Sequence, residues 1–138
     1  MSAQPETVYA FAVLRAVPHV HLGSFVNVGV VVHAPSADFL GMRVLSDVAS
    51  LRARVPDLDV ELLARYLDAC YAVCCGDEAA GPLALAAPSE RFHWLTAPRS
   101  DVLQSSPIHE GVGDPRTALD ELYAFYVDGT SAARSRKS

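Results

Sequence analysis

The chain has 138 residues, of which 51% are hydrophobic and 20% are charged, a composition typical of a single folded domain rather than a disordered protein. Its formal net charge is −5, and residues 1–128 carry 8 basic against 16 acidic side chains, which disfavours binding to a long nucleic acid. No apolar run approaches the ~20 residues that span a bilayer, and the first residues lack the basic and apolar regions of a signal peptide. We therefore expect a cytoplasmic protein that binds neither long nucleic acid nor a membrane.

Three segments in the N-terminal part of the chain have the composition of β-strands. They are residues 7–17, the valine-rich residues 25–33, and residues 39–45. The connections between them are short and rich in turn-forming residues. Because parallel strands need long crossover connections, this spacing predicts an antiparallel meander.

Helical patterns follow the third strand. A short helix is expected over residues 46–54. A longer helix is expected to begin after Asp57 or Asp59 and to end at Gly76, because apolar side chains recur between these points at helical spacing. Residues 77–88 are small, apolar and interrupted by proline, which indicates a loop between two halves of the domain.

The last predicted helix begins at Asp114 and Pro115, which provide an N-cap followed by proline at the first helical position, and it ends at Gly129. Residues 129–138 form a polar, basic tail that we expect to be disordered. The sequence thus predicts a single domain over residues 1–128. Its expected fold class is α+β, with helices packed on an antiparallel β-meander sheet.

Residues 91–111 are the most unusual segment of the sequence. They combine the only tryptophan with two histidines, three serines and two prolines, a mixture that is unfavourable for a helix and too polar for a core strand. Trp94 either anchors this segment in the core or offers a stacking platform for a base. We expect a rigid recognition loop whose polar candidates are Arg99, Ser100, Ser106 and His109.

Two polar residues interrupt the predicted strands. Arg15 either faces solvent or, if it is buried, needs a carboxylate or a bound anion. Asn27, which is close to Gly29, either marks a β-bulge in which its amide bonds to the backbone or points into a pocket. If Arg15 and Arg99 face the same cavity, they could clamp a phosphate or a carboxylate.

Complete catalytic and metal-binding constellations are absent from the sequence. Ser106 and His109 are three residues apart, but no GxSxG nucleophile motif accompanies them, and no glycine-rich phosphate-binding loop is present. The cysteines at positions 70, 74 and 75 fall in one predicted helix without a second cluster to complete a zinc site, which favours buried thiols. We therefore expect no metal and no cofactor, and an enzyme is not the favoured interpretation.

Three stretches of the chain carry a resemblance to a known family. They are YAFAVLRAVP at residues 9–18, FVNVGVVV at residues 25–32, and the pattern WLTAPRS…Q..P.H.G at residues 94–111. With these stretches, nearly the whole chain resembles the bacterial family of domain of unknown function 3037. One departure is Ser24, where the family often has a glutamate. The resemblance implies no assigned activity, but family members often accompany a neighbouring HipA-like kinase gene, which implies a companion or regulatory protein.

The favoured interpretation is a binding or regulatory module that docks a protein partner through residues 91–111 and neighbouring strand residues. The resemblance implies that this partner is a HipA-like kinase. The alternative is an enzyme or sensor for a small anionic metabolite that bears phosphate or carboxylate. In that case Arg15 and Arg99 would neutralise charge and His109 would transfer protons. Asn27 and Ser106 would orient the ligand. The alternative requires these side chains to converge around an open cavity.

Overall fold

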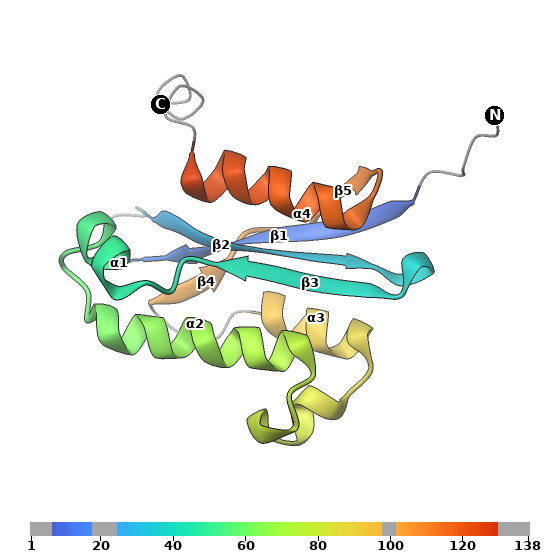
Figure 1. The fold of residues 1–138 in the computed structure, drawn as a ribbon, viewed down its shortest axis with the longest axis horizontal. Helices are drawn as coiled ribbons and strands as arrows, with labels where there is room; N and C mark the ends of the chain where they lie inside the picture. The colour runs from blue at the N-terminus through green and yellow to red at the C-terminus, as the bar shows by residue number, and fades with distance from the viewer. Residues whose placement is uncertain (1–6, 18–24, 98–101, 130–138) are drawn as a thin grey trace.

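The computed structural model describes residues 7–17, 25–97 and 102–129, and Figure 1 shows how they fold. Within them, five antiparallel strands form one sheet and four α-helices pack against it. The predicted α+β fold with an antiparallel sheet is therefore confirmed. The strands are β1 (Val8–Ala16), β2 (Val26–Ala34), β3 (Phe39–Val44), β4 (Leu103–Ser105) and β5 (His109–Val112).

The sheet is built around the predicted meander. Its strand order is β3-β2-β1, and the short strands β4 and β5 both pair with the remaining edge of β1. β5 pairs with residues 8–11 and β4 with residues 14–16, so these two strands follow one another along the same edge. Consequently β3 forms one edge of the sheet, and β4 with β5 forms the other.

Helix boundaries follow the predicted capping signals. Aspartates 47, 59 and 114 each accept a hydrogen bond from the backbone of the first helical turn. α2 ends at Gly76, whose φ of 74° is the left-handed conformation that glycine favours. The helices are α1 (Val48–Arg54), α2 (Val60–Cys75), α3 (Pro88–Thr96) and α4 (Pro115–Tyr123), with a π-helical turn (Ala124–Asp128) after α4 and 3₁₀ turns over Pro35–Ala37, Glu78–Ala80 and Pro82–Leu85.

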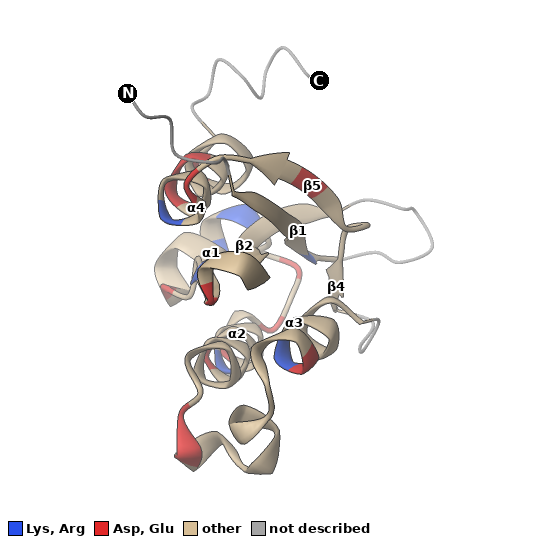
Figure 2. Cartoon of the chain, turned by 90° about the vertical axis from the view of Figure 1, so that its right-hand side faces the viewer, with Lys and Arg blue, Asp and Glu red and all other residues tan. Residues whose placement is uncertain are grey.

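The sheet separates two hydrophobic layers. α2 and α3 cover one face, and α4 covers the other (Figures 1 and 2). The central strand β2 lies between both layers, and its residues Val28, Val30, Val31 and Val32 are fully buried. A strand covered on both faces has no solvent side for polar residues, which explains the continuous valine run. No helix in the described part of the chain is long and apolar enough to cross a membrane.

The prediction of a loop over residues 91–111 was wrong for most of that segment. α3 occupies its first part, and β4 and β5 occupy much of the rest. The helix starts with Pro88 in its first turn, and Phe92 and Leu95 lie buried on one side of it. Packing of these two side chains therefore stabilises a helix whose other residues are mostly polar. β4 and β5 tolerate polar residues because they lie at the edge of the sheet.

Candidate functional site

Arg15 and Asn27 lie opposite one another on β1 and β2. The two strands pair in regular register up to Leu14 and Gly29. Beyond that point Arg15 pairs with Asn27, which leaves Val28 as an extra residue on β2. This is a β-bulge, one of the two alternatives that Asn27 and Gly29 indicate within the valine-rich strand. Because opposite residues of an antiparallel pair share a face, both polar side chains lie on the same side of the sheet.

Asn27 connects the sheet to the helical segment after α4. Its Nδ2 donates a hydrogen bond of 3.1 Å to the main-chain oxygen of Tyr126. Arg54 of α1 donates through Nη1 to the adjacent main-chain oxygen of Val127. These two bonds satisfy carbonyl groups that the end of a helix leaves without partners. The Oδ1 atom of Asn27, by contrast, is buried and has no hydrogen-bond partner among the described residues.

Arg15 is also only partly satisfied. Its guanidinium carbon lies 4.0 Å from the centroid of the Phe25 ring, a cation–π contact. Its Nε atom is buried without a hydrogen-bond partner in the described part of the chain, and burial lowers the pKa of the guanidinium group. A buried donor on Arg15 and a buried acceptor on Asn27 thus lie unpaired on opposite residues of neighbouring strands. Since buried polar atoms are nearly always paired, this position is suited to a water molecule or a small polar ligand.

Ser106 has a structural role at the junction between β4 and β5. Its Oγ accepts a hydrogen bond of 2.9 Å from the N–H of Val13 and donates one of 2.8 Å to the main-chain oxygen of Pro107. The N–H of Ser106 in turn donates to the main-chain oxygen of Val13 at 2.8 Å. The side chain is buried. Its hydroxyl group is therefore engaged within the sheet and is not placed to orient a ligand.

His109 lies apart from the Arg15–Asn27 pair. It is opposite Phe11 on β1, and the two ring centroids are 5.3 Å apart. Arg15 is four residues farther along β1, which corresponds to about 13 Å of strand. Its guanidinium stacks on Phe25, beyond the far end of β1. The structure therefore does not bring His109 together with Arg15 and Asn27.

Trp94 belongs to the other side of the molecule. It lies on α3, partly buried against the core layer formed with α2. Together with Ala69 and Leu83, it lines a mainly apolar cavity of about 330 Å³. The sheet consequently separates Trp94 from Arg15 and Asn27.

Two of the predicted candidates, Arg99 and Ser100, lie outside the described residues. The clamp formed by Arg15 and Arg99 therefore stays a prediction. Among the candidates that the structure does describe, Arg15 and Asn27 come together, whereas Trp94, Ser106 and His109 each have a separate environment.

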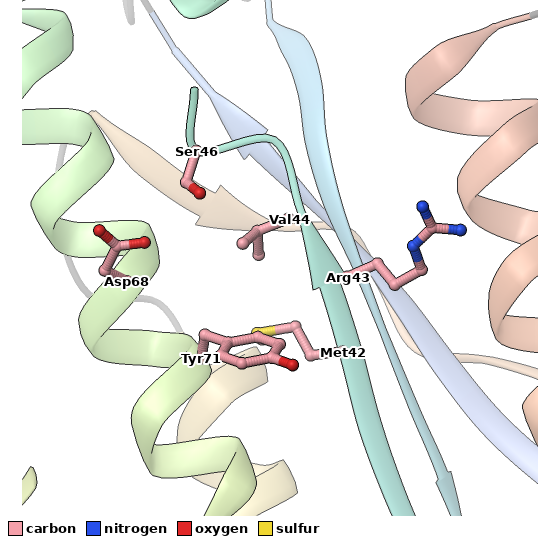
Figure 3. A pocket seen from close by; sticks show the side chains of 6 residues that line it. All are labelled: Met42, Arg43, Val44, Ser46, Asp68 and Tyr71. Atoms are coloured by element: carbon pink, nitrogen blue, oxygen red, sulfur yellow. The ribbon is translucent and has the colours of Figure 1, made fainter. Parts of the chain in front are cut away.

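The outer edge of β3 is a surface that the sequence reasoning missed. Two open cavities, of about 370 and 430 Å³, follow this edge. The smaller one is lined by β3 and by Asp68 and Tyr71 of α2 (Figure 3). The larger one also reaches Arg116 and Leu119 of α4. The edge of β3 thus opens between α2 on one face of the sheet and α4 on the other. Nothing in the local sequence indicates this, because strand order is a property of the whole fold.

Charges beside this edge are distributed unequally. Arg43 of β3 points toward α4 (Figure 3), where its Nη1 lies 3.2 Å from Oδ1 of Asp120 and its guanidinium carbon lies 4.3 Å from the centroid of the Tyr123 ring. On the α2 side, Asp68 forms no ion pair with another described residue. The α4 side of the edge therefore carries this ion pair together with Arg116, which lies over the Phe39 ring, and the α2 side carries a carboxylate without an ion pair among the described residues.

The three cysteines do not form a metal site with other residues in the described part of the chain. Cys70 and Cys74 are buried as expected, and burial raises the pKa of Cys74 to about 12. Cys75 is exposed, which corrects the expectation that all three thiols are buried. It follows Cys74 directly on α2 and so projects from a different side of the helix.

Comparison with known proteins gives one match. The model of a family described as a protein of unknown function (DUF3037) matches residues 11–127. No curated protein and no solved structure matches the chain. The matched region extends from β1 to the end of the helical segment after α4, and it contains Arg15, Asn27 and the whole of β3. The chain therefore belongs to the DUF3037 family.

Proposed function

We propose that this chain is a protein-binding module that serves as the companion or regulator of a HipA-like kinase, and that it is not itself a catalyst. The observation that carries this proposal is the open edge of β3, which lies between α2 and α4 and is accompanied by two cavities. Engagement of the Ser106 hydroxyl within the sheet and the separate position of His109 support a binding role over proton-transfer chemistry.

A contrast between the two sheet edges supports the choice of surface. On one side, β4 and β5 are short and Pro107 lies between them. On the other side, β3 has six residues in uninterrupted register with β2 and contains no proline. Its one charged residue, Arg43, is bonded to Asp120. Proteins usually block their exposed sheet edges, so an edge without such protection is suited to being covered by a partner.

Co-purification tests this function directly. The full chain is co-expressed with a HipA-like kinase from the same genome, and recovery of the complex is compared among variants. Tyr71→Arg places a bulky charge beside β3 and should lower recovery about tenfold, because exposed aromatic residues often dominate binding energy. The matched control is Ile108→Arg, which changes a similarly exposed apolar residue near the opposite edge. Absence of a complex, or equal recovery with Tyr71→Arg and the wild type, would overturn the proposal.

A second candidate function, a sensor for a small anion, is favoured by the unpaired Nε donor of Arg15. The unpaired Oδ1 of Asn27 accepts a hydrogen bond, so it requires a hydroxyl or another donor on the same ligand. A ligand at about one hundred times its dissociation constant stabilises a protein by about 2.7 kcal/mol. Thermal melts with phosphate, nucleotides and carboxylates should then show a rise in Tm of roughly 10 °C for one of them. Arg15→Met should abolish the rise, whereas His109→Ala should leave it unchanged. A rise that persists in Arg15→Met, or no rise with any anion, eliminates this candidate.

A further inference from the structure

The backbone of β3 directs hydrogen-bonding groups outward at the open edge. Leu45 donates its N–H to the main-chain oxygen of Val28 at 2.8 Å, which makes these two residues a hydrogen-bonded pair. Such pairs alternate along an antiparallel ladder, and the register of β3 with β2 has no irregularity. Counting back from Leu45, every second residue bonds to β2. The N–H and C=O groups that point away from the sheet therefore belong to Leu40, Met42 and Val44.

The space beside these groups has the position of a further strand. The larger cavity is lined by Leu40 and Met42 of β3, by Tyr71 of α2 and by Leu119 of α4. Because its walls come from the helices on both faces, this cavity lies in the direction in which the sheet would continue. The smaller cavity extends along the same edge to Val44 (Figure 3). Together the cavities follow β3 and provide the place where an extended peptide can add to the sheet.

Side chains at the Val44 end of the edge determine which peptide fits there, because the Leu40 end carries Arg116 over the Phe39 ring. Asp68 lies beside the Val44 end and has no ion pair with another described residue. Tyr71, which is 45% exposed, offers an apolar surface next to it (Figure 3), whereas Met42 is buried. Residues 1–128 carry twice as many acidic as basic side chains. The domain therefore attracts a basic segment and repels a second copy of itself.

On the basis of the function proposed above, we propose that β3 accepts an extended, basic segment of a partner protein as an added strand. Main-chain groups of Leu40, Met42 and Val44 bond to the backbone of that segment. One lysine or arginine of the segment lies against Asp68, and an apolar side chain on the same face lies against Tyr71.

A labelled decapeptide in which lysine and valine alternate at the odd positions and threonine occupies every even position tests this mode with the full chain, because residues two apart in a strand share a face. Its binding is measured by fluorescence anisotropy, together with two versions that are N-methylated on the backbone of either the odd or the even positions. In a strand, alternate N–H groups face opposite edges. One methylated version should therefore lose at least about tenfold in affinity, whereas the other should bind as the parent does. Equal affinities, or equal losses, would overturn strand addition.

Two pairs of variants test the contacts on this chain. Val44→Pro removes an outward N–H and should weaken peptide binding about fivefold, whereas its control Val44→Ala retains the N–H and should bind nearly as the wild type does. Asp68→Asn should weaken binding about threefold and reduce its dependence on salt. The control Glu78→Gln changes an acidic residue outside both cavities and should have no effect. If Asp68→Asn and Glu78→Gln bind the peptide equally well, the proposed selection for a basic segment by Asp68 is wrong. If Val44→Pro fails to fold, the methylated peptides still test whether the edge binds a strand.

Other occupants of the edge give distinct results. A dimer in analytical ultracentrifugation that Val44→Pro dissociates would assign the edge to a second copy and overturn the proposal. A chain ending at Gly129 that binds the peptide more than about tenfold better would also overturn the proposal, because residues 130–138 would then compete for the edge.

If the kinase complex is absent while the peptides behave as expected, the proposed function fails and strand addition stands. If the complex depends on Tyr71 and both methylated peptides bind equally, strand addition fails and the function stands.

Discussion

Removal of the Ser106 hydroxyl group should destabilise the fold. This side chain closes the sheet where β4 gives way to β5, because its Oγ accepts the hydrogen bond of the Val13 N–H at 2.9 Å. Val13 is 3% exposed and Ser106 is 4% exposed, so no bulk water reaches this bond. In Ser106→Ala, the Val13 N–H keeps its buried position and loses its acceptor.

The magnitude follows from the cost of a buried donor without a partner. Such a group costs about 1–3 kcal/mol, because it has given up water without gaining a protein acceptor. Loss of the bond from Ser106 to the main-chain oxygen of Pro107 adds little, since the serine donor disappears with it. We therefore expect the free energy of unfolding to fall by about 2 kcal/mol. For a domain of this size, that corresponds to a decrease in Tm of roughly 8 °C.

Urea unfolding followed by circular dichroism measures this change, and amide hydrogen exchange at Val13 localises it. The matched control is Ser105→Ala, whose Oγ donates to the main-chain oxygen of Ser106 at 2.8 Å and leaves no buried N–H unpaired when it is removed. This control should cost less than about 1 kcal/mol. If both variants have the same stability, or if exchange at Val13 is unchanged in Ser106→Ala, the structural role assigned to Ser106 is incorrect.

Three further predictions concern single residues. In native protein at pH 8, a thiol reagent should modify Cys75 and spare Cys70 and Cys74 until the chain unfolds, as mass spectrometry would show; rapid native modification of Cys74 would contradict its burial. Burial lowers the pKa of His33, so the unfolded state takes up the proton first, and the free energy of unfolding should decrease as pH falls below about 6.5. That decrease should be smaller in His33→Gln and unchanged in the exposed control His93→Gln, as urea titrations at pH 7.5 and 5.5 would measure. Asn27→Asp removes the donor to Tyr126 and should destabilise the fold by about 1–3 kcal/mol, and a variant as stable as the wild type would show that this tie is dispensable.

The elements with strong local signals could be predicted from the sequence. Short aspartate side chains cap helices, as Asp59 does at the start of α2, and glycine adopts the left-handed conformation at a helix end, as Gly76 does. α3 has no comparable local signal because most of its residues are polar. Burial of Phe92 and Leu95 provides the contact that stabilises this helix. That contact exists only after the sheet and α2 have formed, so no local pattern reports it.

The candidate site could likewise be predicted only in part from the sequence. Arg15 and Asn27 could be identified singly, because each is a polar residue inside an apolar strand. Their pairing could not, since it depends on the extra residue Val28. A shift of one residue in the register would move either side chain to the opposite face of the sheet. The bulge is therefore what turns two separate polar residues into one polar position.

The proposed docking surface shows a further limit of sequence reasoning, because its recognition groups belong to the backbone. The unusual side chains of residues 91–111 predicted a recognition loop. In the structure, Phe92 and Leu95 pack in the core, and Ser106 accepts a hydrogen bond from the N–H of Val13 within the sheet. At the edge of β3, the N–H and C=O groups that can bind a partner are the same for every residue type. They are available because strand order places β3 at an edge and because neither proline nor a bulge blocks it. In the proposed interaction, side-chain identity contributes only the choice of partner, through Asp68 and Tyr71, whereas the capacity to bind comes from the topology.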